Sequence, residues 1–91
     1  MVYKFKTTKQ FDKDVKRCKK RGLPMDDFKT VINDLIDDGK VDAKYKPHRL
    51  TGNRQGQWEC HIHPDWLLVW LQNDEELTLL MLNTGSHSDL F

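Results

Sequence analysis

Several kinds of residue are scarce in this 91-residue chain, and each scarcity excludes a class of protein. The two cysteines, Cys18 and Cys60, lack CxxC spacing and indicate neither a disulfide framework nor a zinc site. No hydrophobic run approaches the roughly 20 residues that a membrane helix needs. The charged start, Met1 to Lys6, does not have the pattern of a signal peptide. We therefore expect a cytoplasmic protein with reduced thiols and no membrane partner.

The length and composition predict one folded domain over residues 1–91. Two cores within 91 residues would each bury too little surface to offset the conformational entropy of the chain. Hydrophobic residues make up 37% and aromatic residues 10% of the sequence, which is enough to build a core and to exclude global disorder.

Lysine and arginine are absent after residue 54, although the formal net charge is only +1. Residues 1–54 hold all 15 basic side chains and 8 acidic ones, an excess of +7, whereas residues 55–91 hold 6 acidic ones. A charge run on a small helix is usually a solvated face. This run is dense enough to favour a surface that binds a phosphate backbone or an acidic segment of a partner protein. Its cations are Lys13, Lys16, Arg17, Lys19, Lys20 and Arg21.

Hydrophobic periodicity in the N-terminal half predicts a strand and two helices. Val2–Lys6 alternates as a strand does, and Thr7 or Thr8 is a suitable cap for a helix to about Arg21. A second helix is predicted from Leu23–Pro24 to Gly39. Residues 40–57 are polar and contain proline and glycine, so we expect a long loop, a kind of segment that often carries function.

The C-terminal half predicts three strands, over residues 58–63, 66–72 and 76–83, and a tail over residues 86–91. The resulting order is β-α-α-β-β-β. We predict an α+β fold in which a helical hairpin packs on a curved, mostly antiparallel four-stranded sheet.

The four histidines all lie at or after position 48 and admit three interpretations. They could be ordinary surface residues, or His61, His63 and Asp65 could begin a metal site, although metallo-hydrolases with such a motif need about twice this length and further ligands. They could also perform acid–base chemistry, because histidine exchanges protons near neutral pH. Beside a basic surface, that chemistry suits the cleavage of RNA. No aromatic RNA-binding motif supports autonomous reading of a nucleic-acid sequence.

Four segments together resemble the RelE/ParE superfamily of bacterial toxins, specifically the YafQ-type messenger-RNA interferases. They read F-x-K-D-x-K over residues 11–16, K-P-H-R-L-T-G over 46–52, H-I-H-P-D-W over 61–66 and T-G-S-H-S-D-L-F over 84–91. The first is weak by itself, and the last two are specific in this order near the end of a short chain.

The resemblance implies a RelE-like fold and an endoribonuclease that cleaves mRNA in the ribosomal A site without a metal or another cofactor. It also implies a cognate antitoxin that neutralises the toxin, and contact with operator DNA only as the toxin–antitoxin complex. The ribosome and its rRNA would be further partners.

Matching the motifs residue by residue implies a catalytic set and a substrate-contacting set. Asp65 and His87 are the leading pair for proton transfer, and His48 and His61 would supply hydrogen bonds or positive charge; which group is base and which acid stays open. The implied catalytic residues are His48, His61, Asp65 and His87. The implied substrate-binding residues are Lys46, Arg49, Arg54, Trp66 and Phe91.

One position departs from the family pattern: many relatives carry an arginine where this chain has Asn83. Charge in the transition state would then rest on the histidines, on Arg49 or Arg54, or on the ribosome. Two alternatives remain open, namely a ParE-like toxin that binds a topoisomerase without catalysis, and an inactive member that acts as a co-repressor. The histidine-rich tail disfavours the first, and Asn83 favours the second.

Overall fold

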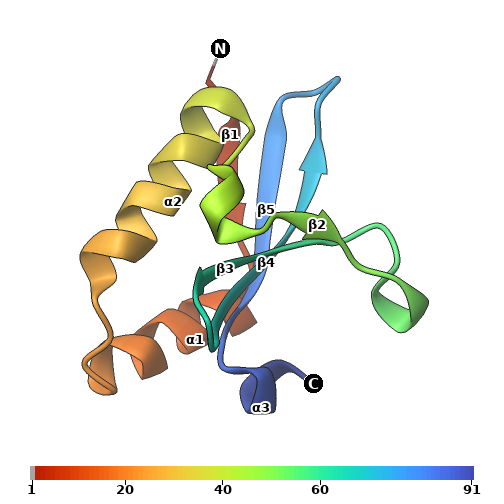
Figure 1. Cartoon of the computed structure of the whole chain (residues 1–91). Coiled ribbons are helices and arrows are strands. Elements are labelled where there is room, and N and C mark those ends of the chain that lie inside the picture. Colours follow the sequence, from red (N-terminus) through yellow and green to blue (C-terminus); the bar gives the residue numbers. More distant parts are fainter. Residues whose placement is uncertain (1) are drawn as a thin grey trace.

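The structure is a computed structural model that describes residues 2–91. Figure 1 shows its helices and strands. In order they are β1 (Lys4–Thr7), α1 (Lys9–Lys20), α2 (Met25–Asp38), the 3-10 turn η1 (Ala43–Tyr45), β2 (His48–Arg49), the 3-10 turn η2 (Gly52–Arg54), β3 (Trp58–His63), β4 (Trp66–Asn73), β5 (Thr78–Gly85) and α3 (His87–Leu90).

The strands form one sheet in the order β1-β5-β4-β3-β2. β1 lies parallel to β5, and every other neighbouring pair is antiparallel. The predicted α+β class is confirmed, but the prediction of four strands is wrong. The fifth strand, β2, lies inside the segment expected to be loop, where His48 pairs with Glu59 and Arg49 with Trp58.

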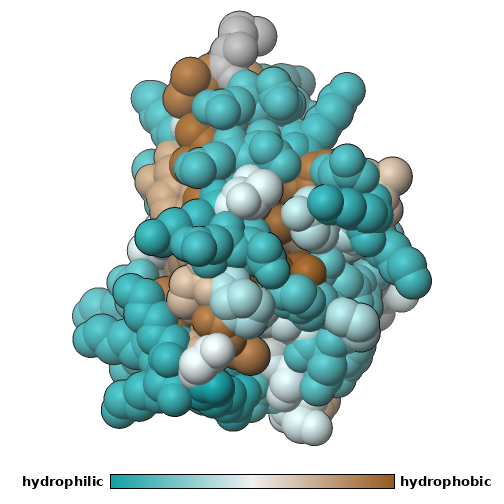
Figure 2. All heavy atoms as spheres, turned by 60° about the vertical axis from the view of Figure 1, so that its left-hand side comes forward, coloured by the Kyte–Doolittle hydropathy of each residue, from teal (hydrophilic) through white to brown (hydrophobic). Residues whose placement is uncertain are grey.

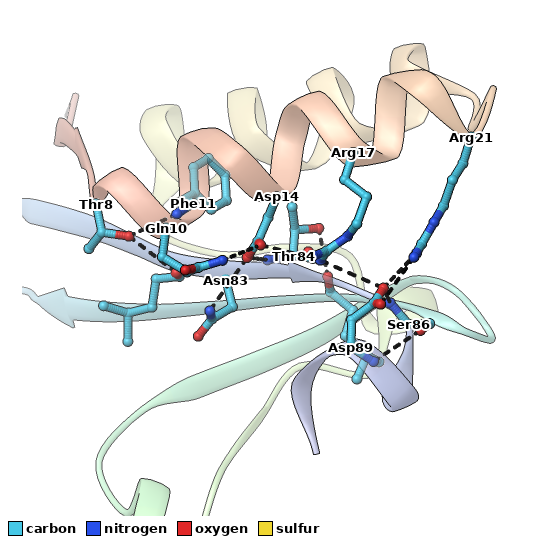
Figure 3. Close-up of polar contacts among 12 residues, drawn as sticks. Thr8, Gln10, Phe11, Asp14, Arg17, Arg21, Asn83, Thr84, Ser86 and Asp89 are labelled. Carbon is cyan, nitrogen blue, oxygen red and sulfur yellow. Dashed lines mark hydrogen bonds and ion pairs between the residues drawn. The ribbon is translucent and has the colours of Figure 1, made fainter.

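The helices α1 and α2 lie on one side of the sheet, as the close-up in Figure 3 also shows. Phe11 of α1 stacks on Phe28 of α2, and Phe28 stacks on Trp66 of β4. These aromatic rings join both helices to the sheet through one buried core. Figure 2 brings the α2 side forward, and hydrophilic residues cover most of that surface.

β4 is central, and its residues 66–70 are buried on both faces, as the continuous hydrophobic run predicts. Leu68 and Trp70 belong to the core beneath the helices. Leu67 and Val69 point to the opposite face because side chains alternate along a strand. These two residues are also fully buried, so the second face is covered at its centre.

Helix α1 closes the edge of β5 where β1 no longer pairs with it. The β1–β5 register ends at Met81, and the Thr8 hydroxyl then donates to the carbonyl of Leu82. The buried carboxylate of Asp14 accepts the backbone N–H of Thr84, and Arg17 donates to the carbonyl of the same residue. These side chains satisfy backbone groups that an exposed edge strand would leave unpaired.

The element boundaries differ from the sequence prediction mainly at strand ends. The first strand spans Lys4–Thr7 instead of residues 2–6, and Thr8 is the cap of α1. The last strand extends to Gly85 instead of ending at residue 83. The tail forms the short helix α3, because Ser86 and Asp89 make a capping box at its start.

The helices of the structure bear on the expectation that no segment crosses a membrane. Among residues 2–91, no helix is both long enough and apolar enough to cross a bilayer.

Candidate active site

Three of the four histidines lie on the face of the sheet opposite to α1 and α2. Glu59 and His61 alternate with the core residues of β3, so both point to this face. His48 joins them because β2 pairs it directly with Glu59. The floor between β3 and β5 consists of Leu67 and Val69, which pair with β3 on one side and β5 on the other.

Asp65 and His87 make the closest polar contact of this face. The carboxylate Oδ1 of Asp65 accepts the backbone N–H of His87 at 2.9 Å and lies 2.6 Å from the ring Nδ1. The backbone N–H of His87 is the main cause that lowers the pKa of Asp65, and the imidazole adds to it. Asp65 therefore holds both the orientation of the His87 ring and a hydrogen on its Nδ1, since an ionised carboxylate can only accept.

His61 lies between His87 and His48. Its ring centroid is 5.7 Å from that of His87 and 6.2 Å from that of His48. The three rings therefore form a row along the open face, with Asp65 at one end. The structure brings together all four residues of the predicted catalytic set.

His63 does not share this face with His61, although the i, i+2 spacing predicts that it does. A register irregularity between His61 and His63 turns the strand. The ring of His63 stacks on Trp66, and its Nε2 lies 2.7 Å from Asp27 of α2. His63 thus belongs to the contacts between the sheet and α2.

Arg54 reaches the open face from the loop that precedes β3. Its Nη2 donates to Oδ1 of Asn83 at 3.2 Å, and its guanidinium lies 5.3 Å from the ring centroid of Phe91. A cation thus stands beside position 83 although the residue there is an asparagine. Arg54 and Phe91 also line a shallow pocket of about 330 Å³ with Leu90 and Asn53.

The structure separates two of the predicted substrate-binding residues from this cluster. Trp66 is only 2% exposed, and its indole N–H donates to Thr84 inside the core, so its role is structural. Arg49 alternates away from His48 and lies over the ring of Trp58, on the side of the helices. The predictions that these two side chains contact substrate are therefore not supported.

Lys46 lies next to the histidine row. Its backbone carbonyl is 2.9 Å from Nδ1 of His48. The residue also lines a hollow of about 320 Å³ together with Lys44 and His61. Lys46 is therefore near enough to this row for the substrate contact that the sequence predicts.

Helix α3 carries His87 and is followed by Phe91, and Asp89 joins it to the C-terminal end of α1 (Figure 3). Arg21 donates to both carboxylate oxygens of Asp89, at 2.6 and 3.1 Å. Arg17 lies 3.6 Å from the same carboxylate. Arg21 holds the pKa of Asp89 well below its ordinary range, with help from the backbone N–H of Ser86. We call Arg17, Arg21 and Asp89 the α3 clamp.

Gly85 leaves the room that the α3 clamp needs. A Cβ atom at this position would lie 2.7 Å from Oδ2 of Asp89 and 2.8 Å from Nη2 of Arg17. The backbone φ of +156° is also one that side chains with a Cβ rarely adopt. These contacts give a steric reason for a glycine at this position of the T-G-S-H segment.

Sequence reasoning missed two buried carboxylates that organise this region. Asp14 is 1% and Glu59 5% exposed. Asp14 lies among the lysines of α1, a pattern that predicts a solvent-exposed helix face. Glu59 alternates with hydrophobic residues along its strand, a pattern that predicts an exposed side chain. Neither pattern signals that another element covers the side chain.

The described residues offer no ready metal site. Among residues 2–91, no group of three or more histidine, cysteine, aspartate or glutamate side chains is placed to hold a metal ion.

The fold and this row of side chains define a class of protein: a small α+β domain with a histidine–aspartate pair on an open sheet face. Residues 3–91 match the family described as "Bacterial toxin of type II toxin-antitoxin system, YafQ". The chain belongs to this family.

Known relatives agree with this membership. The curated "mRNA interferase toxin YafQ" of Escherichia coli (strain K12) is 36% identical over 83 residues, covering 90% of this chain and 88% of the relative. The crystal structure of YafQ from E. coli strain BL21(DE3) matches with a TM-score of 0.90 at 32% identity, over 98% of each chain. YafQ in the E. coli DinJ–YafQ toxin–antitoxin complex matches with a TM-score of 0.90 at 33% identity, over 100% of this chain and 99% of the other.

Proposed function

We propose that this protein is an endoribonuclease that cleaves mRNA on the ribosome and so inhibits translation. The observation that carries the proposal is the Asp65–His87 pair, with a contact of 2.6 Å, in one row with His61 and His48. Its family membership and the name of the curated relative support the same activity.

The proposed reaction is the internal cleavage of an RNA backbone by the 2′-hydroxyl next to the scissile phosphate. One group takes the proton of the 2′-hydroxyl, whose oxygen attacks phosphorus, and another group gives a proton to the leaving 5′-oxygen. The products are a 2′,3′-cyclic phosphate and a 5′-hydroxyl.

His87 is suited to take the proton from the 2′-hydroxyl. Because Nδ1 faces the carboxylate of Asp65, the lone pair of the neutral ring is on Nε2, which is directed away from that contact. A carboxylate that fixes the tautomer of a histidine base is a recurrent arrangement in acid–base catalysis. The central position of His61 suits it to contact the phosphate, with Arg54 near Phe91 as a further cation.

The openness of the site supports dependence on the ribosome. The side chains of Asp65 and His87 are 70% and 55% exposed, so the protein itself encloses little of a substrate. Positioning by the ribosome would supply the orientation that a shallow site lacks.

We also propose a cognate antitoxin as the protein partner, because a solved relative was crystallised as a toxin–antitoxin complex. Operator DNA would be contacted only through that complex.

The test is induced expression of the wild type beside a variant that carries both Asp65→Ala and His87→Ala, with the 5′ ends of cellular mRNA mapped. We expect growth arrest and cuts at codon positions with the wild type, and neither with the double variant. Growth arrest by both proteins without mRNA cuts would contradict the proposal and favour a non-catalytic toxin. Equal cleavage of ribosome-free RNA would contradict the dependence on the ribosome.

A further inference from the structure

We propose that the hollow between η1 and the end of β3 binds a nucleotide that flanks the scissile phosphate, with its base stacked on the ring of His63. The inference rests on the proposed function and adds to it a contact with RNA outside the histidine row. It is carried by the orientation of one exposed ring and by the cations that line the same hollow.

The ring of His63 is exposed and yet held in one orientation. It lies nearly parallel to the indole of Trp66, with an angle of 8° between the planes and 5.9 Å between the centroids. Its Nε2 lies 2.7 Å from Oδ2 of Asp27. The side chain is nevertheless 45% exposed. A ring that is already fixed loses little freedom when a nucleobase stacks on it, and histidine is one of the side chains on which RNA bases stack.

The fold places this ring beside the histidine row. A register irregularity after His61 turns His63 toward α2, so the two rings stand on different faces at the end of β3. Both residues line the hollow of about 320 Å³ next to η1. A nucleotide that fills this hollow is therefore the neighbour of one that lies against His61 in the row.

Two lysines line the same hollow and suit the phosphates of a bound nucleotide. The ammonium group of Lys44 lies 5.1 Å from the ring centroid of Tyr45, and Lys46 follows at the end of η1. Among residues 2–91, no carboxylate lies within 4.0 Å of either ammonium group, so both charges are available to an anion. Asp27 also lines the hollow, but its carboxylate is in contact with His63.

The backbone of Lys46 supports a binding role for this hollow. Its φ of +52° lies in the left-handed region, which residues with a Cβ adopt rarely. Pro47 follows, and a residue before proline favours an extended backbone. The structure thus overrules two local preferences at Lys46, and strained residues of this kind cluster at sites that bind ligands.

A second hollow also contains His63 but suits a nucleotide less well. It has a volume of about 370 Å³ and lies on the side of Trp66 and Asp65. Arg21 lines it, but the guanidinium of this residue is already bound to Asp89. The carboxylate of Asp65 would repel a phosphate there. The hollow with the two lysines is therefore the one that fits a nucleotide.

Two substitutions of His63 separate stacking from a structural role. His63→Gln keeps a hydrogen-bond donor for Asp27 but has no ring. His63→Phe keeps a ring but cannot contact Asp27. If the ring binds RNA, His63→Phe should retain binding and His63→Gln should lose it. If the residue only links the sheet to α2, His63→Phe should lower the melting temperature more, and RNA binding should follow stability.

The first experiment measures binding without cleavage. Its probe is a single-stranded RNA hexamer with 2′-O-methyl groups, which cannot form the cyclic phosphate. We expect nuclear Overhauser effects between the ring protons of His63 and base protons of the hexamer. His63→Gln should raise Kd by roughly 5- to 100-fold, as the loss of one stacked base does, and His63→Phe should stay within about threefold. An unchanged Kd in His63→Gln, an equal loss in both variants, or no binding by the wild type at millimolar RNA would overturn the inference.

A peptide of six glutamates is the second probe, because the same lysines suit an acidic segment of a protein. The peptide should bind His63→Gln as well as it binds the wild type, since it has no base to stack. An equal loss for the peptide and for RNA would show that His63 does not recognise a base, and the proposal would then be wrong.

The phosphate contact is tested by salt. Lys46→Gln should reduce the slope of log Kd against log salt concentration by about 0.7, which is the loss of one phosphate contact to a single strand. Lys29→Gln is the matched control, because it removes an exposed lysine of α2 that does not line this hollow. A change of the same size in both variants, or in neither, would contradict a phosphate in this hollow.

The last experiment measures cleavage on programmed ribosomes. His63→Gln should raise KM and leave kcat within about twofold, because stacking is equal in the ground state and the transition state. A fall in kcat at unchanged KM would give the ring a role in the chemistry and refute the subsite. If RNA contacts His63 but the wild type cleaves no mRNA, the proposed function fails while the subsite stands. If mRNA is cleaved and His63→Gln binds RNA as the wild type does, only the subsite fails.

Discussion

The α3 clamp predicts that a residue outside the histidine row controls the placement of His87. Asp89→Asn keeps the size of the side chain but removes its charge. In the wild type Asp89 is 15% exposed, accepts two hydrogen bonds from Arg21, and accepts the backbone N–H of Ser86 at 2.8 Å. The amide can still accept one hydrogen bond, but it cannot accept all of these or balance two arginines.

The expected cost follows from the two interactions that weaken. Weakening the Asp89 half of the capping box costs up to about 1 kcal/mol, and loss of an ion pair to an exposed arginine costs about 0.2–1 kcal/mol. A total of roughly 1–2 kcal/mol changes the docking equilibrium of α3 by about 5- to 30-fold. Since the pKa of Asp89 is lowered in the folded protein, this stabilisation is complete above the pKa of an unfolded aspartate. It is lost as the pH falls through the folded value.

Amide hydrogen exchange at neutral pH measures this equilibrium directly. The N–H of Phe91, which donates to the carbonyl of His87 at 2.9 Å, should lose about 5- to 30-fold of its protection in Asp89→Asn. Arg21→Gln should have the same effect in direction, whereas Lys20→Gln, the loss of a neighbouring exposed cation of α1, should have none. Unchanged protection in Asp89→Asn, or an equal loss in Lys20→Gln, would refute the clamp.

Three further predictions concern the site and the core. Asp65→Asn should lower single-turnover cleavage by roughly 10²- to 10⁴-fold, because the amide no longer fixes the tautomer of His87; a loss below about threefold would contradict its role. The lowered pKa of Asp65 means that the wild-type carboxylate stays ionised, and this part of the activity persists, until the pH falls below that lowered value. Arg54→Ala should weaken cleavage, and adding Asn83→Arg should restore part of it if the guanidinium beside Phe91 is what matters; no recovery would place the role of Arg54 elsewhere. Burial raises the pKa of the Cys60 thiol to about 12, so iodoacetamide should label it slowly in the native protein and fast in denaturant, and rapid native labelling would show that the core opens.

The sequence alone could predict the elements with a strong internal pattern. The second helix, Met25–Asp38, has apolar residues at helical spacing, and it ends at Gly39 in the left-handed conformation as expected. Residues 66–70 of the predicted strand are buried on both faces, as a continuous hydrophobic run should be, whereas Leu71 is exposed. The motifs around Asp65 and His87 also identify two side chains that the fold brings into contact.

The rest depends on contacts between distant segments, which no local pattern records. The two-residue strand β2 exists only because β3 pairs with it, and its residues have no alternation long enough to detect. The bulge after His61 moves His63 to the other face, an effect that simple alternation cannot anticipate. Burial of Glu59 and Asp14 requires covering elements, the first near His48 and the second along β5.

The separation of charge along the sequence has a structural meaning that its net value hides. Arg17 of α1 and Arg21, which caps its C-terminal end, do not form a free basic face, because they hold Asp89 of the acidic half. Arg54 likewise reaches across to Asn83 of β5. The basic half therefore assembles the site through specific contacts, in addition to the RNA-binding surface that we propose for it.

The two uses of positive charge can be separated by salt. Attraction between exposed lysines and a phosphate backbone weakens steeply as ionic strength rises, because binding releases counterions. The contact of Arg21 with Asp89, at 2.6 Å and with a carboxylate that is 15% exposed, is screened less. Substituting Lys19 or Lys20, both exposed on α1, should therefore reduce the salt dependence of RNA association and leave α3 protected. Substituting Arg21 should release α3 at every salt concentration. If both substitutions changed only the salt dependence, α1 would be a binding surface and not a support for His87.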